Sequence, residues 1–241
     1  MDLFNTIILN VIFGFAALIT SVTGFGFALI ATPLTVLILL PSTAVPVVVM
    51  SWMPLSIFLA AGSFRDMSPR RIFRLYVCSL PGVPIGIHVL TKFDADVVSL
   101  IIGSLTLVAA GAMAIQSGRP LRRPMVAFAG AGFVSGVMGG VCGITGPPVV
   151  FLGLKQQWKP ASMRADLIGY FFLLHASILL FFRGDGIIGM SIVAMSLRAM
   201  PGVVVGYAGG LLLRKYVSDR SYRSLALVLA GAAGGIAIIF S

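Results

Sequence analysis

Two stretches decide how this chain folds: Gly24-Phe25-Gly26-Phe27-Ala28-Leu29-Ile30-Ala31-Thr32-Pro33 and Gly139-Gly140-Val141-Cys142-Gly143-Ile144-Thr145-Gly146-Pro147-Pro148. Each interrupts a hydrophobic segment with glycine and proline, which break helices and free backbone N–H and C=O groups. In a membrane such a break is tolerated only where it is buried in protein or lines a cavity. A pair of broken segments at matching positions of two halves is a sequence marker of a transporter's binding site.

The composition indicates a protein that is embedded in a lipid bilayer. Hydrophobic residues make up 59% of it, charged residues only 10%, and Glu is absent. A soluble surface needs roughly a quarter charged residues, so we expect an all-α polytopic membrane protein. The net charge of +10 comes from basic residues in short loops, which favours contact with membrane lipid headgroups over nucleic acid. Cys78 and Cys142 have no metal-type spacing, and no metal or cofactor site is predicted.

The hydropathy pattern predicts eight to ten membrane helices, some of them broken or re-entrant. A full crossing needs about 20 apolar residues, which 27–40 and 144–154 lack, so each of these two either crosses with strain or re-enters. The ten apolar segments are 3–22, 27–40, 43–62, 72–91, 97–116, 124–140, 144–154, 163–182, 187–213 and 221–240.

The two halves of the chain also match outside the broken stretches. Leu80-Pro81-Gly82-Val83-Pro84-Ile85-Gly86 corresponds to Met200-Pro201-Gly202-Val203-Val204-Val205-Gly206. We therefore predict a first membrane repeat over 1–118 and a second over 119–241, each of about five segments. Because the number of segments in a repeat is odd, the second repeat is expected to be inserted with inverted topology.

Loop charges test the inversion independently, because Lys and Arg accumulate in cytoplasmic loops. The loop after 43–62 is strongly basic, whereas its counterpart after 163–182 has only Arg183. For the other pairs of matching loops, the loop of the second half is the more basic one. With the basic loops placed in the cytoplasm, both termini are predicted on the outer side of the membrane. The basic residues assigned to the cytoplasmic face are Arg65, Arg70, Arg71, Arg74, Arg119, Arg122, Arg123, Lys155, Lys159, Arg164, Arg214, Lys215, Arg220 and Arg223.

The broken stretches suit an anion. A helix leaving each break would point its N-terminus, with free N–H groups and a positive dipole end, into the protein. Proline fits the first turn of a helix, the place expected for Pro33 and Pro148. The alternative explanation of the same glycines is close helix packing. The candidate binding residues are Gly24, Gly26, Thr32, Pro33, Gly139, Gly140, Gly143, Thr145, Gly146, Pro147 and Arg198.

Two ionisable residues are predicted deep in spans. Arg198 lies near the middle of 187–213, where an arginine costs roughly 2.5–3.5 kcal/mol, so it is a candidate anion ligand or else a snorkelling side chain. His175 lies in the middle of 163–182 and is a candidate proton relay, with a hydrogen-bonded packing role as the alternative.

The paired Gly/Pro stretches, the Pro-Gly-Val sequences at Pro81 and Pro201 and the duplicated length resemble the TauE/SafE family of sulfite and organosulfur exporters. The resemblance implies a multi-pass permease of the bacterial inner membrane for sulfite, sulfonates or related small anions. Alternating access around the broken helices would make it a secondary transporter; a passive anion channel is the alternative. An enzyme is not expected, because the chain has two histidines and no Gly-x-Ser-x-Gly elbow. The sequence leaves open whether copies of the chain form a homo-oligomer.

Overall fold

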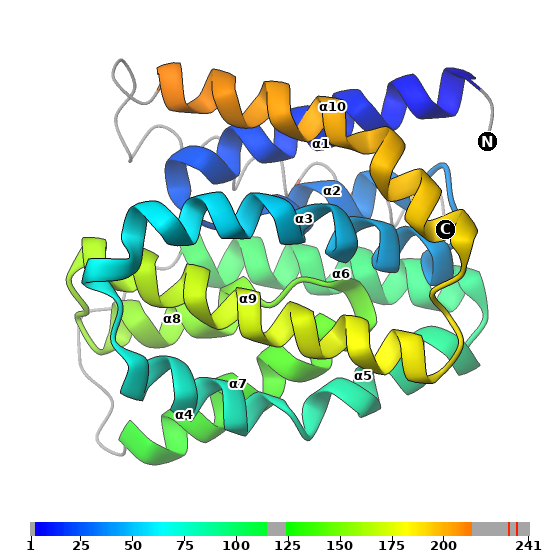
Figure 1. The fold of residues 1–241 in the computed structure, drawn as a ribbon. Coiled ribbons are helices and arrows are strands. Elements are labelled where there is room, and N and C mark those ends of the chain that lie inside the picture. The colour runs from blue at the N-terminus through cyan, green and yellow to red at the C-terminus, as the bar shows by residue number, and fades with distance from the viewer. Residues whose placement is uncertain (1–2, 115–123, 214–230, 232–234, 236–241) are drawn as a thin grey trace.

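The structure is a computed structural model that describes residues 3–114, 124–213, 231 and 235. The described residues form ten α-helices and one turn of 3₁₀ helix, with no strand among them. Most of the helices lie side by side along a common direction, as Figure 1 shows. The predicted all-α fold is confirmed.

Five helices are long and apolar enough to cross a membrane, and a bent pair of shorter helices adds a sixth candidate span. This arrangement fits the predicted polytopic membrane protein. Apart from residues 231 and 235, the predicted segment 221–240 lies outside the described residues, as do the basic residues of 115–123 and 214–223. The five long helices are α1 (Leu3–Thr23), α3 (Pro41–Ser63), α7 (Pro124–Cys142), α9 (Pro160–Gly184) and α10 (Met190–Leu213). The bent pair is α4 (Pro69–Ser79) with α5 (Gly82–Lys92), and the remaining elements are η1 (Phe64–Asp66) and the apolar α6 (Ala95–Ala114).

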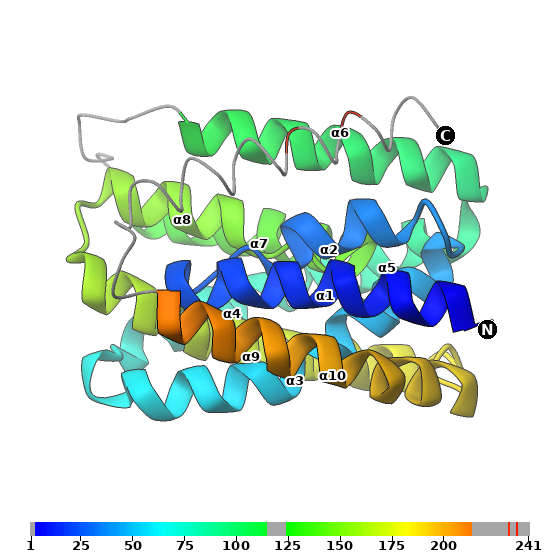
Figure 2. The ribbon, with the colours of Figure 1, turned by 90° about the horizontal axis from the view of Figure 1, so that it is seen from above.

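Two further helices are too short to cross the bilayer by themselves. α2 (Phe27–Thr35) has 9 residues and α8 (Gly146–Lys155) has 10. At a rise of about 1.5 Å per residue, each reaches only about half of the hydrocarbon thickness. α2 packs on α1 and α8 packs on α7, and each turns back in the direction from which the chain arrived (Figures 1 and 2). Each short helix therefore forms the returning arm of a hairpin whose turn is the glycine break.

The segment 72–91, predicted as one span, is divided into two helices. The chain bends by 45° between α4 and α5, at Leu80 and Pro81. Proline lacks the N–H that would continue the helix, and its ring clashes with the preceding turn. Pro201 occupies the matching sequence position, yet it lies inside the continuous helix α10.

The side chain of Asn10 lets α10 continue past Pro201. Its amide nitrogen donates to the Arg198 carbonyl at 2.8 Å, and its amide oxygen accepts from the Gly202 N–H at 2.7 Å. These are the two backbone groups that would bond each other in a regular helical turn. The Asn10 amide on α1 therefore bridges the turn that contains Pro201.

Close glycine contacts hold two helix pairs together. α10 crosses α1 where Gly202 and Gly206 face backbone atoms of Asn10 and Gly14, and α5 crosses α7 in the same manner. A Cβ atom at any of these glycines would collide with a backbone carbonyl of the other helix. Small residues allow helix backbones to approach closely in membranes, where packing replaces the hydrophobic drive. On α5 the close glycines are Gly82 and Gly86, and on α7 Gly140 faces them. Gly132 and Gly136 of α7 instead face Leu75, Cys78 and Ser79 of α4.

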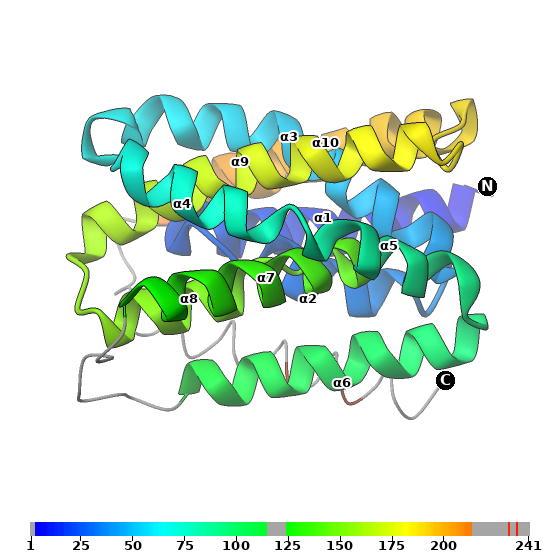
Figure 3. The same cartoon turned by 90° about the horizontal axis from the view of Figure 1, so that it is seen from below.

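Directions and charges follow a pattern along the molecule. α1 and α7 run in opposite directions, as do α3 and α9, which Figures 1 and 3 let the reader follow. The connections from α3 to α4 and from α8 to α9 lie at one end, at the left of Figure 1. Basic residues in these connections or in the adjoining helix ends are Arg65, Arg70, Lys155 and Lys159. The start of α1 and the α5–α6 and α9–α10 connections lie at the other end. Most described basic residues thus gather at one end of the helices.

Two glycines of α7 provide a matched test of the packing. Gly136→Ala would place a Cβ against the Ser79 carbonyl, whereas Gly130→Ala would meet no atom within 4 Å. We expect Gly136→Ala to lower the free energy of unfolding by about 1–3 kcal/mol through overpacking. Gly130→Ala should leave it unchanged or raise it by up to about 1 kcal/mol, because alanine is the better helix former. Thermal unfolding midpoints in detergent measure both. Equal midpoints would show that this crossing is not tightly packed.

Candidate functional site

Glycines with positive φ angles create both breaks. Gly24 and Gly26 have φ angles of 81° and 101°, and Gly143 has a φ angle of 70°. Residues with a Cβ rarely adopt this left-handed region. α1 therefore ends ahead of Gly24 and α2 begins directly after Gly26, while α7 ends at Cys142 and α8 begins at Gly146.

Side chains bond the carbonyl groups that the second break frees. The Thr32 hydroxyl donates to the Cys142 carbonyl at 2.8 Å, and His175 Nε2 lies 3.0 Å from the Gly143 carbonyl. A carbonyl can only accept, so Nε2 of His175 carries the proton in this bond. The Ser135 hydroxyl donates to the Thr145 carbonyl at 2.6 Å and accepts from the Tyr170 hydroxyl at 2.8 Å. Every one of these donors is buried.

The first break has a corresponding partner from the other half of the chain. Arg164 on α9 donates from Nη2 to the Ser21 carbonyl at 2.6 Å, near the end of α1. A Cβ atom added at Gly24 would touch the Arg164 side chain. Thr32 of the first half and Arg164 of the second half thus each bond a carbonyl at the break in the other half.

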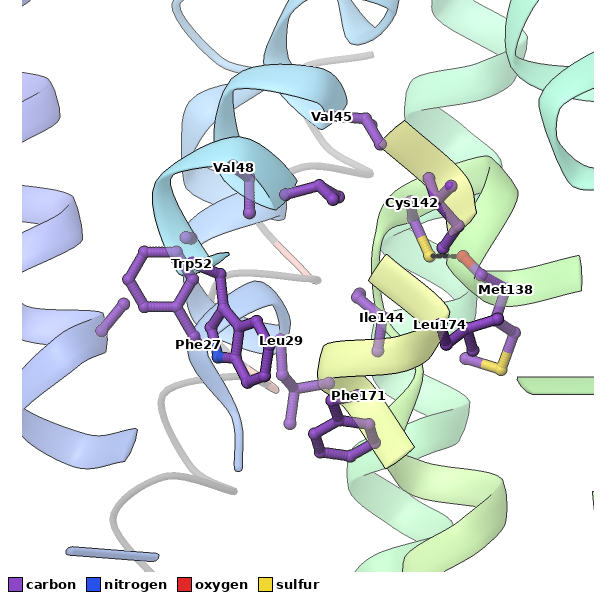
Figure 4. Packing of buried hydrophobic residues seen from close by; sticks show 14 of the residues in the cluster. Phe27, Leu29, Val45, Val48, Trp52, Met138, Cys142, Ile144, Phe171 and Leu174 are labelled. Atoms are coloured by element: carbon purple, nitrogen blue, oxygen red, sulfur yellow. Dashed lines mark hydrogen bonds between the residues drawn. The ribbon is translucent and has the colours of Figure 1, made fainter. Parts of the chain in front are cut away.

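The two breaks meet in one small cavity. Trp52 lies midway along α3, and Phe171 and His175 lie in the middle part of α9. The free space inside is about 20 Å³, enough for about one water molecule. A multi-atom ligand would need the cavity to expand. Figure 4 shows Trp52 and Phe171 beside the first turn of α2 at Phe27 and Leu29. The lining residues are Phe25, Gly26, Phe27, Ala28, Leu29, Trp52, Gly143, Ile144, Thr145, Gly146, Pro147, Phe171 and His175.

Both short helices direct their N-termini at this cavity. Gly26 and Thr145 are their N-cap residues, and neither makes a side-chain capping hydrogen bond. The N–H groups of the first turn of a helix have no partner within the helix. In α2 these belong to Phe27, Ala28 and Leu29, whereas Pro147 and Pro148 leave the first turn of α8 with fewer donors. The cavity therefore combines two positive helix ends with backbone donors, an arrangement that suits an anion.

About half of the predicted site residues line the cavity, and the others do different work. Gly26, Gly143, Thr145, Gly146, Pro147 and His175 are in the lining. Thr32 bonds the Cys142 carbonyl, and Gly24 lies against the Arg164 side chain. Both residues stabilise the breaks without lining the cavity. Gly139 packs on Thr145 and Ile178, and Gly140 packs on the backbone of α5. For these two glycines the structure agrees with the alternative explanation, close packing of helices.

The structure corrects the expectation for Pro33. This residue lies inside α2 and not in its first turn, because the positive φ angle of Gly26 lets the helix begin at Phe27. Pro148 does lie in the first turn of α8, as predicted. Arg198 does not line the cavity. Its side chain is exposed on α10, where the surrounding surface is apolar, and this position fits the snorkelling alternative.

The aromatic wall of the cavity was not predicted from the sequence. Trp52 and Phe171 stand at the same offset from Pro41 and Pro160, the prolines that begin α3 and α9. Their rings meet edge to face, with centroids 6.1 Å apart. These matching positions in the two halves could have indicated a shared role for the two aromatic residues. Hydropathy alone does not distinguish a cavity-lining aromatic residue from a core residue.

Comparisons with known proteins agree on one family. The family model described as "Sulfite exporter TauE/SafE" matches residues 9–236. A similar protein is the "Probable sulfite/organosulfonate exporter TauE" of Cupriavidus necator, which is 27% identical over 208 residues, covering 82% of this chain and 79% of that protein. No solved structure is significantly similar to this chain.

The hydroxyl of Thr32 provides a test of how the breaks are stabilised. Thr32→Val removes the donor to the Cys142 carbonyl and leaves a buried acceptor unpaired, so we expect a loss of about 1–3 kcal/mol in the free energy of unfolding. Thr35→Val is the matched control, because the Thr35 hydroxyl bonds Ala31 within the same helix, and the Ala31 carbonyl keeps its helical partner. Thermal unfolding in detergent compares the two variants. An equal loss would show that the contact between the breaks adds no stability.

Proposed function

This chain belongs to the sulfite exporter TauE/SafE family, and from that premise we propose that it is a secondary transporter that exports a small sulfur oxyanion, sulfite or an organosulfonate. The observation that carries the proposal is the meeting of two uncapped helix N-termini in one buried cavity at the middle of α3 and α9. We assign binding roles, and no catalytic role, to the residues of this cavity.

Electrostatics supports an anionic substrate. A helix N-terminus stabilises a nearby anion by about 0.3–1 kcal/mol, and by up to about 2 kcal/mol in partly buried geometries. Two such ends face this cavity, with backbone N–H groups on α2 and the hydroxyl of Thr145 as donors. An oxyanion offers several acceptor oxygens to these donors. Gly143 and Gly146 leave the backbone accessible at close range.

We further propose that residues 1–118 and 119–241 act as inverted repeats that alternate access to the cavity. The opposite directions of α1 and α7, and of α3 and α9, support this arrangement. So does the reciprocal bonding of the breaks by Thr32 and Arg164. In this proposal the protein lies in the bacterial inner membrane, with the basic end of the helices cytoplasmic and both termini outside.

Contacts between the halves close the cytoplasmic end in this proposal. Asp166 on α9 is almost fully buried and accepts from Arg71 at 2.7 Å and from the Ser68 N–H at 2.5 Å. Arg71 also lies over the ring of Trp158, 4.9 Å from its centroid. Arg164 holds the end of α1 from the same helix. Opening toward the cytoplasm would have to separate these contacts, so they favour the closed conformation.

Flux in proteoliposomes tests the export proposal. We expect uptake of radiolabelled sulfite or methanesulfonate to exceed that of protein-free vesicles and to become concentrative when an ion gradient is imposed. A dissipative flux that never exceeds equilibrium, with single-channel currents, would instead identify the passive anion channel. Absence of flux for every sulfur oxyanion would overturn the proposal.

Two variants connect this flux to the cavity. Gly146→Val should lower flux by at least roughly ten-fold, the effect of about 1.4 kcal/mol, because its methyl groups would extend toward Phe171, whose ring already lies 3.4 Å from the Cβ position. Arg198→Ala should keep its apparent affinity within about two-fold, because Arg198 does not line the cavity. Both are compared with the unmodified protein at equal membrane abundance. A large loss of affinity in Arg198→Ala would place the anion elsewhere.

Cysteine accessibility tests the orientation. Arg65→Cys and Lys159→Cys lie at the basic end, and Asp94→Cys and Asp185→Cys lie at the other; all four positions are exposed. In a Cys78→Ala background, with Cys142 fully buried, an impermeant thiol reagent added to intact cells should label only the second pair. Labelling of the first pair, or of one residue from each pair, would contradict the proposed topology.

A further inference from the structure

We infer that Trp52 binds the transported anion directly: its indole N–H donates to an oxygen of an organosulfonate, while its ring and that of Phe171 enclose the organic group. The inference rests on the proposed function and adds to it a residue and a choice of substrate. It begins from the position of Trp52, which lies in the cavity lining and is only 3% exposed.

The indole ring is held firmly among other rings. Its centroid lies 6.1 Å from that of Phe171 and 4.9 Å from that of His175. Figure 4 shows the ring turned toward Phe27 and Leu29, which belong to the first turn of α2. Trp52 therefore stands next to the backbone donors at the N-terminus of that helix.

The indole N–H makes no hydrogen bond to a residue that the structure describes, and it does not belong to the fully buried polar groups that lack a partner. A tryptophan that is buried in a protein usually finds a partner for this group, because an unpaired buried donor costs free energy. Thr145, another residue of the lining, makes no side-chain capping bond to its own helix. Trp52, Thr145 and the first turn of α2 thus line one small space, together with His175, whose Nδ1 is an acceptor without a hydrogen-bond partner among the described residues.

The rest of the lining is apolar and selects among sulfur oxyanions. Phe25, Ile144 and Phe171 form walls that offer no side-chain hydrogen bond. Sulfite must lose the water around its charged oxygens and its lone pair when it enters the cavity. It has no apolar group whose burial would offset this cost. An organosulfonate carries three oxygens at one end and an apolar group at the other, which suits a lining that contains both hydrogen-bond donors and aromatic rings. The lining therefore favours a short alkanesulfonate over sulfite.

Tryptophan fluorescence can report binding at this residue alone, because the chain has 2 tryptophans, Trp52 and Trp158. In Trp158→Phe protein the emission comes only from Trp52. We expect a saturable change in this emission when methanesulfonate is added. In Trp52→Phe protein, which retains Trp158 near the cytoplasmic end, the same titration should leave the emission unchanged.

Affinities of the same two variants test the hydrogen bond. Trp52→Phe keeps an aromatic ring but loses the N–H, so the apparent Kd for radiolabelled methanesulfonate should rise by about ten-fold or more. Trp158→Phe makes the same chemical change outside the cavity and keeps an aromatic ring under Arg71, so its apparent Kd should stay within about two-fold of that of the unmodified protein. Trp52→Leu removes the ring as well, and should also reduce the preference for methanesulfonate over sulfite.

The outcomes separate this inference from the export proposal. An active transporter whose Trp52 emission does not respond, or whose Trp52→Phe variant binds normally, overturns the role of Trp52 and leaves export standing. A response of Trp52 in a protein that transports neither anion supports the binding residue and overturns export. A tighter affinity for sulfite than for methanesulfonate overturns the selection of organosulfonates.

Discussion

The structure depends on one constraint: backbone groups freed inside the hydrocarbon region must find partners within the protein. The chain breaks its helices at Gly24–Gly26 and at Gly143, and then bonds exposed carbonyls with side chains from distant segments. Thr32 reaches Cys142, and Arg164 reaches Ser21. Each break thus has one carbonyl bonded by a side chain of the other half, while His175 and Ser135 bond carbonyls of the second break from within the same half. Hydrogen bonds at the helix breaks therefore join the two halves.

The same constraint gives the cavity its electrostatic character. Side-chain donors occupy the carbonyls of Cys142, Gly143 and Thr145. The N-terminal ends of α2 and α8, in contrast, have no capping side chain. Satisfying the acceptors and leaving the donors open produces a site with an excess of positive ends. This excess needs no buried Lys or Arg in the lining, so the site avoids the large desolvation cost of a permanent buried charge.

Glycine serves two different purposes in this fold, which explains why both interpretations of the glycine-rich stretches have merit. At Gly26 and Gly143 it allows a positive φ angle and opens the backbone to the cavity. At Gly136 and Gly140 it allows α7 to touch the α4–α5 pair along their backbones. Glycines a few positions apart therefore have different roles. A glycine that faces the cavity opens the backbone to it, and a glycine that faces another helix allows close packing.

Features that depend on local chemistry could be predicted from the sequence. Apolar segment lengths predicted the helical membrane protein, and Gly and Pro predicted the two breaks, whereas it stayed open whether 27–40 and 144–154 cross or re-enter until the structure gave α2 and α8 their short lengths. The sequence also indicated that N-terminal helix ends would favour an anion. Which side chains line the cavity or bond the breaks followed from the packing of the helices. This packing directed Arg198 to the surface, gave Thr32 and His175 carbonyl partners across the fold, and brought Trp52 to Phe171. Composition and periodicity describe neighbours along the chain, whereas a binding cavity is formed by helix faces that meet only after packing.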